Sequence, residues 1–192
     1  SKVSASPKNL LSVKIFCVSI CKIRQMIANA KGNCIFSWNF IKIMMLSIHS
    51  DDYFMKEAFR EATFAAENGE VPVGAVIVCD NRIIARGSNR TEQLGDITAH
   101  AEIIAITAAA DFLGSKYLTD CTLFVTLEPC SMCAGALYWS QISRVVYGAS
   151  DEKRGFMKFG KAMLHPQTKL SYGVMEAQCR QLLQEFFSHK RN

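Results

Sequence analysis

The chain has 192 residues, of which 49% are hydrophobic and 20% are charged, a composition typical of a folded domain with an ordinary core. Its net charge of +5 is unevenly distributed, because residues 1–50 hold seven Lys or Arg and no acid, whereas residues 51–192 carry a net charge of −2. The chain is therefore not uniformly basic. Residues 144–192, with nine basic and four acidic side chains, form the segment best suited to contact a polyanion.

Residues 1–50 differ from the rest of the chain, since they are rich in Lys, Ile, Ser and Cys and show poor periodicity. The apolar run at 10–21 is interrupted by Lys14 and is too short to span a membrane, and no clear cleavage site marks a secretory signal. Residues 1–50 are therefore expected to be a poorly ordered extension foreign to the domain at 51–192, with the functional protein beginning near Met44. The alternative is an arm that contacts RNA or a membrane.

The elements after residue 50 follow from hydrophobic periodicity and turn residues. A helix capped by Asp51 or Asp52 is expected to run to about Asn68, and a hairpin of strands at 71–79 and 82–86 follows. Farther along we expect a polar loop at 87–96, a helix that Thr98 caps and that runs to about Phe112, a strand at 121–127 and a short helix at 130–140. After these we expect a strand at 144–148, an irregular basic segment at 151–167, strand structure at Val174 and an amphipathic helix at 176–189. This alternation of strands and helices after a hairpin predicts an α/β domain with a mixed sheet.

The chain has eight cysteines, and only Cys130 and Cys133 have the spacing of metal ligands. Cys79, Cys121 and Cys179 lie in apolar patterns and are expected to be small buried side chains. Because the spacings suggest no disulfide framework, the sequence favours a reducing cytoplasm.

Cys130 and Cys133 are three residues apart, which places both sulfurs on one face of a helix. If Pro129 and Cys130 open that helix, its positive end lowers both thiol pKa values and favours the thiolates that bind metal. His100, near the start of the preceding helix, supplies a third ligand. Three protein ligands leave a coordination position for water, as in catalytic zinc sites. Cys121 belongs to a strand, and His165 in a loop remains an alternative fourth ligand.

Glu102 follows His100 by two residues, about 200° of rotation on an ideal helix, so the two side chains do not share a face. Both can still flank a metal at the helix end, with Glu102 acting as a proton shuttle for the activated water rather than as a ligand. A lone Cys-x-x-Cys is a weak motif, and its redox interpretation needs a thioredoxin-like context that is absent here. The ordered pair His-x-Glu and Pro-Cys-x-x-Cys is the known signature of zinc-dependent nucleobase deaminases.

Residues 53–191 resemble the cytidine-deaminase superfamily, and most closely its bacterial tRNA-specific adenosine deaminases. The strings that carry the resemblance are EVPVGAV at 70–76, GSNR at 87–90, TAHAEI at 98–103, VTLEPCSMCAGA at 125–136 and RVVYGA at 144–149. The resemblance implies a cytidine-deaminase-like three-layer α/β/α fold with a mixed sheet of about five strands. It also implies a homodimer that converts the wobble adenosine of an arginine tRNA to inosine.

The resemblance also implies roles for individual residues. One zinc ion per subunit would be bound by His100, Cys130 and Cys133, and Glu102 would be the catalytic proton shuttle. The residues implied in substrate binding are Asn89, which would hold the flipped base through its amide, Asp151, which would contact the ribose of a neighbouring nucleotide, and Lys153, Phe186 and Arg191, which would contact RNA.

Alternatives remain open for the substrate-binding residues. Asn89 could satisfy a turn backbone, Asp151 could cap its loop, and Phe186 could be a core or dimer contact. The basic cluster at 153–161 could be an ordinary solvated face. For the whole chain, one rival function is deamination of a free base or nucleotide, namely cytosine, guanine or dCMP. Another rival is a non-catalytic subunit or zinc-stabilised RNA-binding module, which the presence of Glu102 disfavours.

Overall fold

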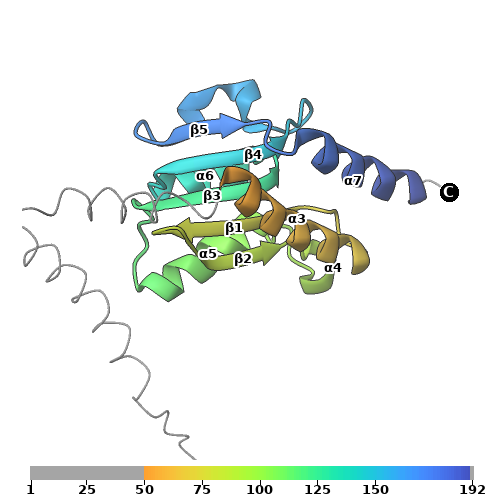
Figure 1. The fold of residues 1–192 in the computed structure, drawn as a ribbon, viewed down its shortest axis with the longest axis horizontal. Coiled ribbons are helices and arrows are strands. Elements are labelled where there is room, and N and C mark those ends of the chain that lie inside the picture. The colour runs from red at the N-terminus through yellow and green to blue at the C-terminus, as the bar shows by residue number, and fades with distance from the viewer. Residues whose placement is uncertain (1–49, 191–192) are drawn as a thin grey trace, which may run out of the picture. The chain divides into compact units, whose positions relative to one another are not determined.

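The computed structural model describes residues 50–190, so all of the predicted extension except Ser50 lies outside the described residues. The described part contains five strands, five α-helices and two short 3₁₀ helices (Figure 1). In chain order they are α3 (Asp51–Glu67), β1 (Gly74–Cys79), β2 (Arg82–Ser88), α4 (Thr91–Leu94), α5 (Ala101–Leu113), β3 (Cys121–Leu127), α6 (Ser131–Trp139), β4 (Arg144–Ala149), η1 (Phe156–Phe159), η2 (Lys161–Met163), β5 (Lys169–Tyr172) and α7 (Glu176–His189). None of the described helices is both long enough and apolar enough to cross a membrane.

The five strands form one mixed sheet in the order β2-β1-β3-β4-β5. β1 pairs antiparallel with β2 and with β3, while β3, β4 and β5 are parallel to one another. Helices α3 and α7 pack on one face, and α5 and α6 lie on the other (Figure 1). The predicted three-layer α/β/α fold with a mixed sheet of about five strands is confirmed.

The apolar strands at the centre of the sheet bury both faces. Ala75 and Ile77 of β1 belong to the core beneath α5 and α6, whereas Val76 and Val78 belong to the core beneath α3. Because side chains alternate along a strand, a strand covered on both sides is apolar at successive positions. This explains why β1 appears in the sequence as an unbroken apolar run and why β3 is apolar at three successive positions, 123–125.

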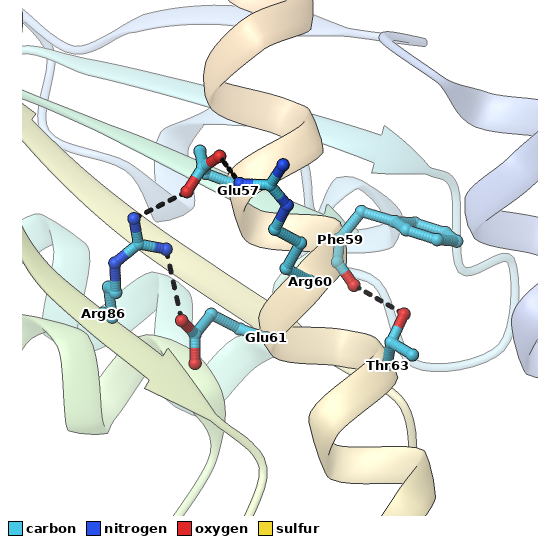
Figure 2. Close-up of polar contacts among 6 residues, drawn as sticks. All are labelled: Glu57, Phe59, Arg60, Glu61, Thr63 and Arg86. Carbon is cyan, nitrogen blue, oxygen red and sulfur yellow. Dashed lines mark hydrogen bonds and ion pairs between the residues drawn. The ribbon is translucent and has the colours of Figure 1, made fainter.

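An ion-pair cluster ties α3 to the edge strand β2 (Figure 2). The guanidinium of Arg86 lies 2.6 Å from Glu57 and 3.3 Å from Glu61, and Arg60 also contacts Glu57. Glu57 is only 6% exposed, so its carboxylate depends on these cations for compensation. None of the residues of this cluster lines the cavity described below.

Two predicted helix caps are wrong. Ser50, not Asp51 or Asp52, caps α3 by accepting a hydrogen bond from the Tyr53 amide. Asp51 instead pairs with both terminal nitrogens of Arg144. Thr98 does not cap α5, because its amide and hydroxyl both donate to Asp96. In each case a distant or neighbouring polar partner competes for the side chain that the sequence pattern assigns to the cap.

Several predicted boundaries also shift, whereas the strand at Cys121–Leu127 and the helix at Glu176–His189 are confirmed. The predicted polar loop at 87–96 contains the end of β2 and the short helix α4, and the irregular segment at 151–167 contains η1 and η2. Strand β5 at Lys169–Tyr172 was not predicted, and Val174 lies in a turn after it. β5 is a short edge strand without an apolar period, so only its pairing with β4 reveals it.

Candidate metal centre and active-site cavity

His100 and Cys130 occupy the same position in two different helices, since each is the residue that precedes the first helical turn. His100 precedes α5 with φ −71° and ψ 152°, and Cys130 precedes α6 with φ −73° and ψ 173°. Their side chains therefore lie at helix N-termini, where the helix dipole is positive. α6 begins at Ser131, so Pro129 lies one residue before the cap rather than at the predicted first helical position.

A close approach between α5 and β2 sets the position of His100. A Cβ atom on Gly87 would lie 2.2 Å from the carbonyl oxygen of Ala101, the first residue of α5. Only glycine leaves room for the helix to begin directly against the strand. The GSNR string therefore has a packing role at its first residue, which brings the start of α5 to the end of the sheet.

Three side chains converge into a group that fits a zinc ion. The Nδ1 atom of His100 lies 3.7 Å from the Cys130 sulfur and 3.5 Å from the Cys133 sulfur, and all three ligand atoms lie within 4.8 Å of one another. Tetrahedral zinc with ordinary bond lengths requires a nitrogen–sulfur separation of roughly 3.6 Å. Within residues 50–190 this is the single group of this kind, and neither Cys121 nor His165 belongs to it.

The two thiols of this group differ in acidity. Hydrogen bonds from Cys133 and His100 lower the pKa of Cys130 to about 4. The pKa of Cys133 is raised, because its thiol hydrogen-bonds to Cys130 and because it is buried beside Glu102. Of the two thiol pKa values that were predicted to be low, only that of Cys130 is lowered, and side-chain hydrogen bonds are its leading cause. Zinc binds thiolates, so its binding would displace the proton that Cys133 retains.

Glu102 lies in the first turn of α5 and is 3% exposed. It lines the same cavity as His100 and Cys130 but is not part of the metal-binding group. Burial raises the pKa of Glu102 above the usual range for a glutamate, an effect that the nearby His100 partly opposes. A carboxyl group with a raised pKa exchanges protons closer to neutral pH, as a proton shuttle requires.

The metal-binding group opens into a cavity of about 650 Å³, large enough for a nucleobase. Its walls come from the loop before β1, the β2–α4 connection, the starts of α5 and α6, the segment after β4, and α7. The lining residues are Val71, Val73, Asn89, Thr91, His100, Glu102, Leu127, Glu128, Cys130, Asp151, Lys153, Arg154, Leu183 and Phe187. Of the described substrate-binding residues expected from the sequence, Phe186 is not in this lining, and its neighbour Phe187 is.

Asn89 is buried in the wall of the cavity, where its amide is fixed by side chains rather than by a turn backbone. Its Nδ2 donates to Glu70 at 3.1 Å and to the Thr91 hydroxyl at 3.2 Å. Glu70, 1% exposed, also accepts from the Gln93 amide at 2.8 Å. Burial acts to raise the pKa of Glu70, but these hydrogen bonds outweigh burial and lower it. Sequence analysis missed Glu70, although a glutamate just before an apolar strand is a weak indication of a paired acid.

Asp151 adopts the capping role that the sequence left as an alternative, since one carboxylate oxygen accepts from the amides of Lys153 and Arg154, both at 3.0 Å. It also lines the cavity, together with these two exposed cations. Phe186 is half-buried on α7, where the Lys190 ammonium lies 4.8 Å from the centre of its ring. Arg191 lies outside the described residues.

Comparison with known proteins agrees with this geometry. The profile of the cytidine and deoxycytidylate deaminase zinc-binding region matches residues 48–149. The fold and the His–Cys–Cys group thus define a zinc-dependent deaminase that binds one zinc ion per subunit.

A curated tRNA-specific adenosine deaminase from Aquifex aeolicus is 46% identical over 146 residues, which cover 73% of this chain and 96% of the relative. A solved structure from work on A-to-I editing by tRNA:A34 deaminases at the wobble position is 43% identical, covers 68% of this chain and 99% of its own, and has a TM-score of 0.65. The chain belongs to the family of tRNA-specific adenosine deaminases. A solved guanine deaminase from Bacillus subtilis is also 43% identical, but over 53% of this chain and 65% of its own, with a TM-score of 0.51.

Proposed function

We propose that this chain converts the wobble adenosine of a tRNA anticodon to inosine by hydrolytic deamination, and that its substrate is an arginine tRNA. The observation that carries the proposal is a single cavity, into which the metal-binding group opens and which Glu102 and Asn89 line. The exposed cations Lys153 and Arg154 form a basic rim at this cavity. Deamination of a free base requires only the metal-binding group, Glu102 and a residue that holds the base. Binding of an RNA loop also requires basic side chains for its phosphates, which the rim supplies. The choice of an arginine tRNA is supported by the family resemblance alone.

The reaction consumes one water and releases one ammonia. Bound zinc acts as a Lewis acid that makes water a nucleophile near neutral pH. Glu102 accepts a proton from the water and delivers it to N1 of adenine while the water oxygen adds to C6. Glu102 then takes the second proton from that oxygen and delivers it to the amino group. The C6–N bond breaks, ammonia departs and the C6 carbonyl of inosine remains.

Other residues in and beside the cavity bind and orient the nucleotide. The adenine must leave the anticodon stack to enter the cavity, where the Asn89 amide, held by Glu70 and Thr91, contacts its edge. Asp151 contacts the ribose of a neighbouring nucleotide. Lys153 and Phe186 contact the RNA beside the cavity, with Lys153 and its neighbour Arg154 facing the phosphates. Binding therefore weakens as the salt concentration rises.

The test offers the zinc-loaded protein an anticodon stem-loop with adenosine at the wobble position and, separately, free adenine, guanine, cytosine and dCMP. Inosine is expected in the stem-loop at the wobble position alone, with ammonia released from none of the free compounds. A stem-loop with guanosine at that position is the matched control and should be unchanged. Ammonia release from a free base without inosine formation in the stem-loop would overturn the tRNA assignment in favour of the rival function.

We also propose that the enzyme is a homodimer in the cytoplasm. Three large apolar side chains on or near α5 and α6 are exposed, Phe112 at 60%, Tyr117 at 44% and Trp139 at 78%. Tyr117 and Trp139 line one shallow hollow, and exposed apolar surface of this kind is typical of an interface. All five described cysteines are free, consistent with a reducing compartment. Light scattering should give twice the subunit mass, and Trp139→Glu should halve it. Phe64→Glu, on α3 at the opposite face of the sheet, should leave the dimer intact; loss of the dimer in both variants would contradict this interface.

The functional protein is further proposed to begin near Met44, with residues 1–43 dispensable. The family match starts at residue 48, and residues 47–192 form one compact unit. A chain starting at Met44 should deaminate the stem-loop with the KM of the full chain. A large loss of tRNA binding on truncation would instead establish the upstream residues as an RNA-contacting arm.

A further inference from the structure

One wall of the active-site cavity is a short stretch of chain that follows β4 and runs into the start of η1, residues 151–157, which we call the rim segment. It contributes Asp151, Lys153 and Arg154 to the cavity lining. The two basic side chains are exposed, so they do not hold the segment in place by packing. The positions of Lys153 and Arg154 therefore depend on the contacts that hold the backbone of the rim segment.

Glu128 contacts both ends of the rim segment. It follows β3 directly and is 6% exposed. One carboxylate oxygen accepts the amide of Asp151 at 3.0 Å, and the other accepts the amide of Met157 at 2.9 Å. Hydrogen bonds from backbone amides to a buried carboxylate are strong, and leaving any of these groups unpaired is costly.

Two further contacts bring the rim segment against the chain that carries the zinc ligands. The amide of Phe156 donates to the Pro129 carbonyl at 3.0 Å, and Gly155 forms an isolated β-bridge with Cys130. A Cβ atom on Gly155 would lie 2.2 Å from a carboxylate oxygen of Glu128. Gly155 has φ −61°, a value that any residue adopts, so glycine is required there for space.

We propose that Glu128 is a positioning residue, which holds the rim segment so that Lys153 and Arg154 face the RNA that enters the cavity. This inference rests on the proposed function and adds to it the device that links the metal centre to the RNA-contacting surface. A carboxylate suits the role, because it accepts at both oxygens. Glutamine retains one acceptor and presents an NH₂ group to the other backbone amide, which is donor against donor.

Two variants disrupt the contact from opposite sides, Glu128→Gln at the carboxylate and Gly155→Ala at the segment. Glu57→Gln is the matched control, since Glu57 has the same 6% exposure but lies in the α3 ion-pair cluster (Figure 2). The measurements on each variant are zinc content, KM and kcat with the stem-loop, and the dependence of KM on salt. Hydrogen exchange at the amides of Asp151 and Met157 reports directly on the rim segment.

Glu128→Gln is expected to raise KM about tenfold, the effect of losing roughly one such hydrogen bond, with a much smaller change in kcat. The slope of log KM against log salt should fall by about 1.4, because two misplaced cations each cost roughly 0.7 on single-stranded RNA. Gly155→Ala should show the same pattern, with faster exchange in both variants and a full zinc content. Glu57→Gln should lower the melting temperature while leaving KM and the salt slope as in the wild type.

The inference is overturned if both rim variants keep the wild-type KM, salt slope and exchange rates. It is equally overturned if they lose zinc, because Glu128 would then support the metal centre. Failure of the proposed function looks different, since the wild-type protein itself would then leave the stem-loop unchanged.

Discussion

The two sides of the cavity are built by different means. The metal side consists of helix starts embedded in the core, with Cys133 fully buried and Glu102 nearly so. The rim side consists of irregular chain and one face of α7, and it exposes Lys153, Arg154 and Phe187. The metal side performs a reaction that different substrates share, as the similarity to a guanine deaminase illustrates. The zinc-binding chemistry is therefore placed on buried helix starts, whereas the proposed RNA contacts lie on exposed, irregular chain, the kind of segment that tolerates sequence change most readily.

Removal of a metal ligand should have the largest effect. Cys133→Ala is expected to reduce zinc from one ion per subunit to nearly none and to abolish deamination, because two protein ligands hold zinc poorly. Elemental analysis and the stem-loop assay measure both quantities. Cys179→Ala is the matched control, because Cys179 is also a buried cysteine but lies on α7, outside the metal-binding group. This variant should retain zinc and activity. Activity in zinc-free Cys133→Ala would show that the metal side is not the catalytic side.

Glu102→Gln separates zinc binding from catalysis. The variant should bind zinc normally, since Glu102 is not a ligand, while kcat falls about 10²- to 10⁴-fold, the usual contribution of a general acid–base group. Single-turnover inosine formation with saturating enzyme isolates the chemical step. A rate close to that of the wild type would exclude Glu102 as the proton shuttle.

Glu70→Gln tests the hydrogen bonds that hold the Asn89 amide in the cavity wall. Because hydrogen bonds lower the pKa of Glu70 below its ordinary 4.5, the ionised form stabilises the fold above that pH, and the contribution is lost as the pH falls through the lowered value. The variant should be less stable at pH 7 by about 1–3 kcal/mol, the cost of unpairing buried donors. Its disadvantage should shrink in acid, as followed by urea unfolding at several pH values. Parallel pH profiles for variant and wild type would refute this role.

Arg86→Met should have the smallest effect, confined to stability. Arg86 is partly exposed and Glu57 keeps its pair with Arg60, so the loss of the Arg86 pairs with Glu57 and Glu61 is expected to cost only about 1 kcal/mol in unfolding free energy (Figure 2). The KM and kcat for the stem-loop should not change, because the cluster does not line the cavity. A raised KM would mean that α3 and β2 transmit strain to the rim, and the two sides could not be treated as separate.

The sequence alone determined the class of chemistry. His100 and Glu102 lie in one short motif and Cys130 and Cys133 in another, each at a helix start, and local spacing fixes the neighbours within each motif. The two motifs are 30 residues apart and meet only in the fold. The strand at 121–127 and the helix at 176–189 were equally readable, because the periodicity of apolar residues is itself local.

Only the tertiary structure decided how the substrate side is assembled. Glu70 and Glu128 look like ordinary acids in the sequence, since the amides they accept lie 23 and 29 residues farther along the chain. Successive residues on a helix point about 100° apart, so the docking of α7 decides that Phe187 rather than Phe186 lines the cavity. Spacing in the sequence fixes neighbours within an element, whereas the contacts that shape this rim form between elements.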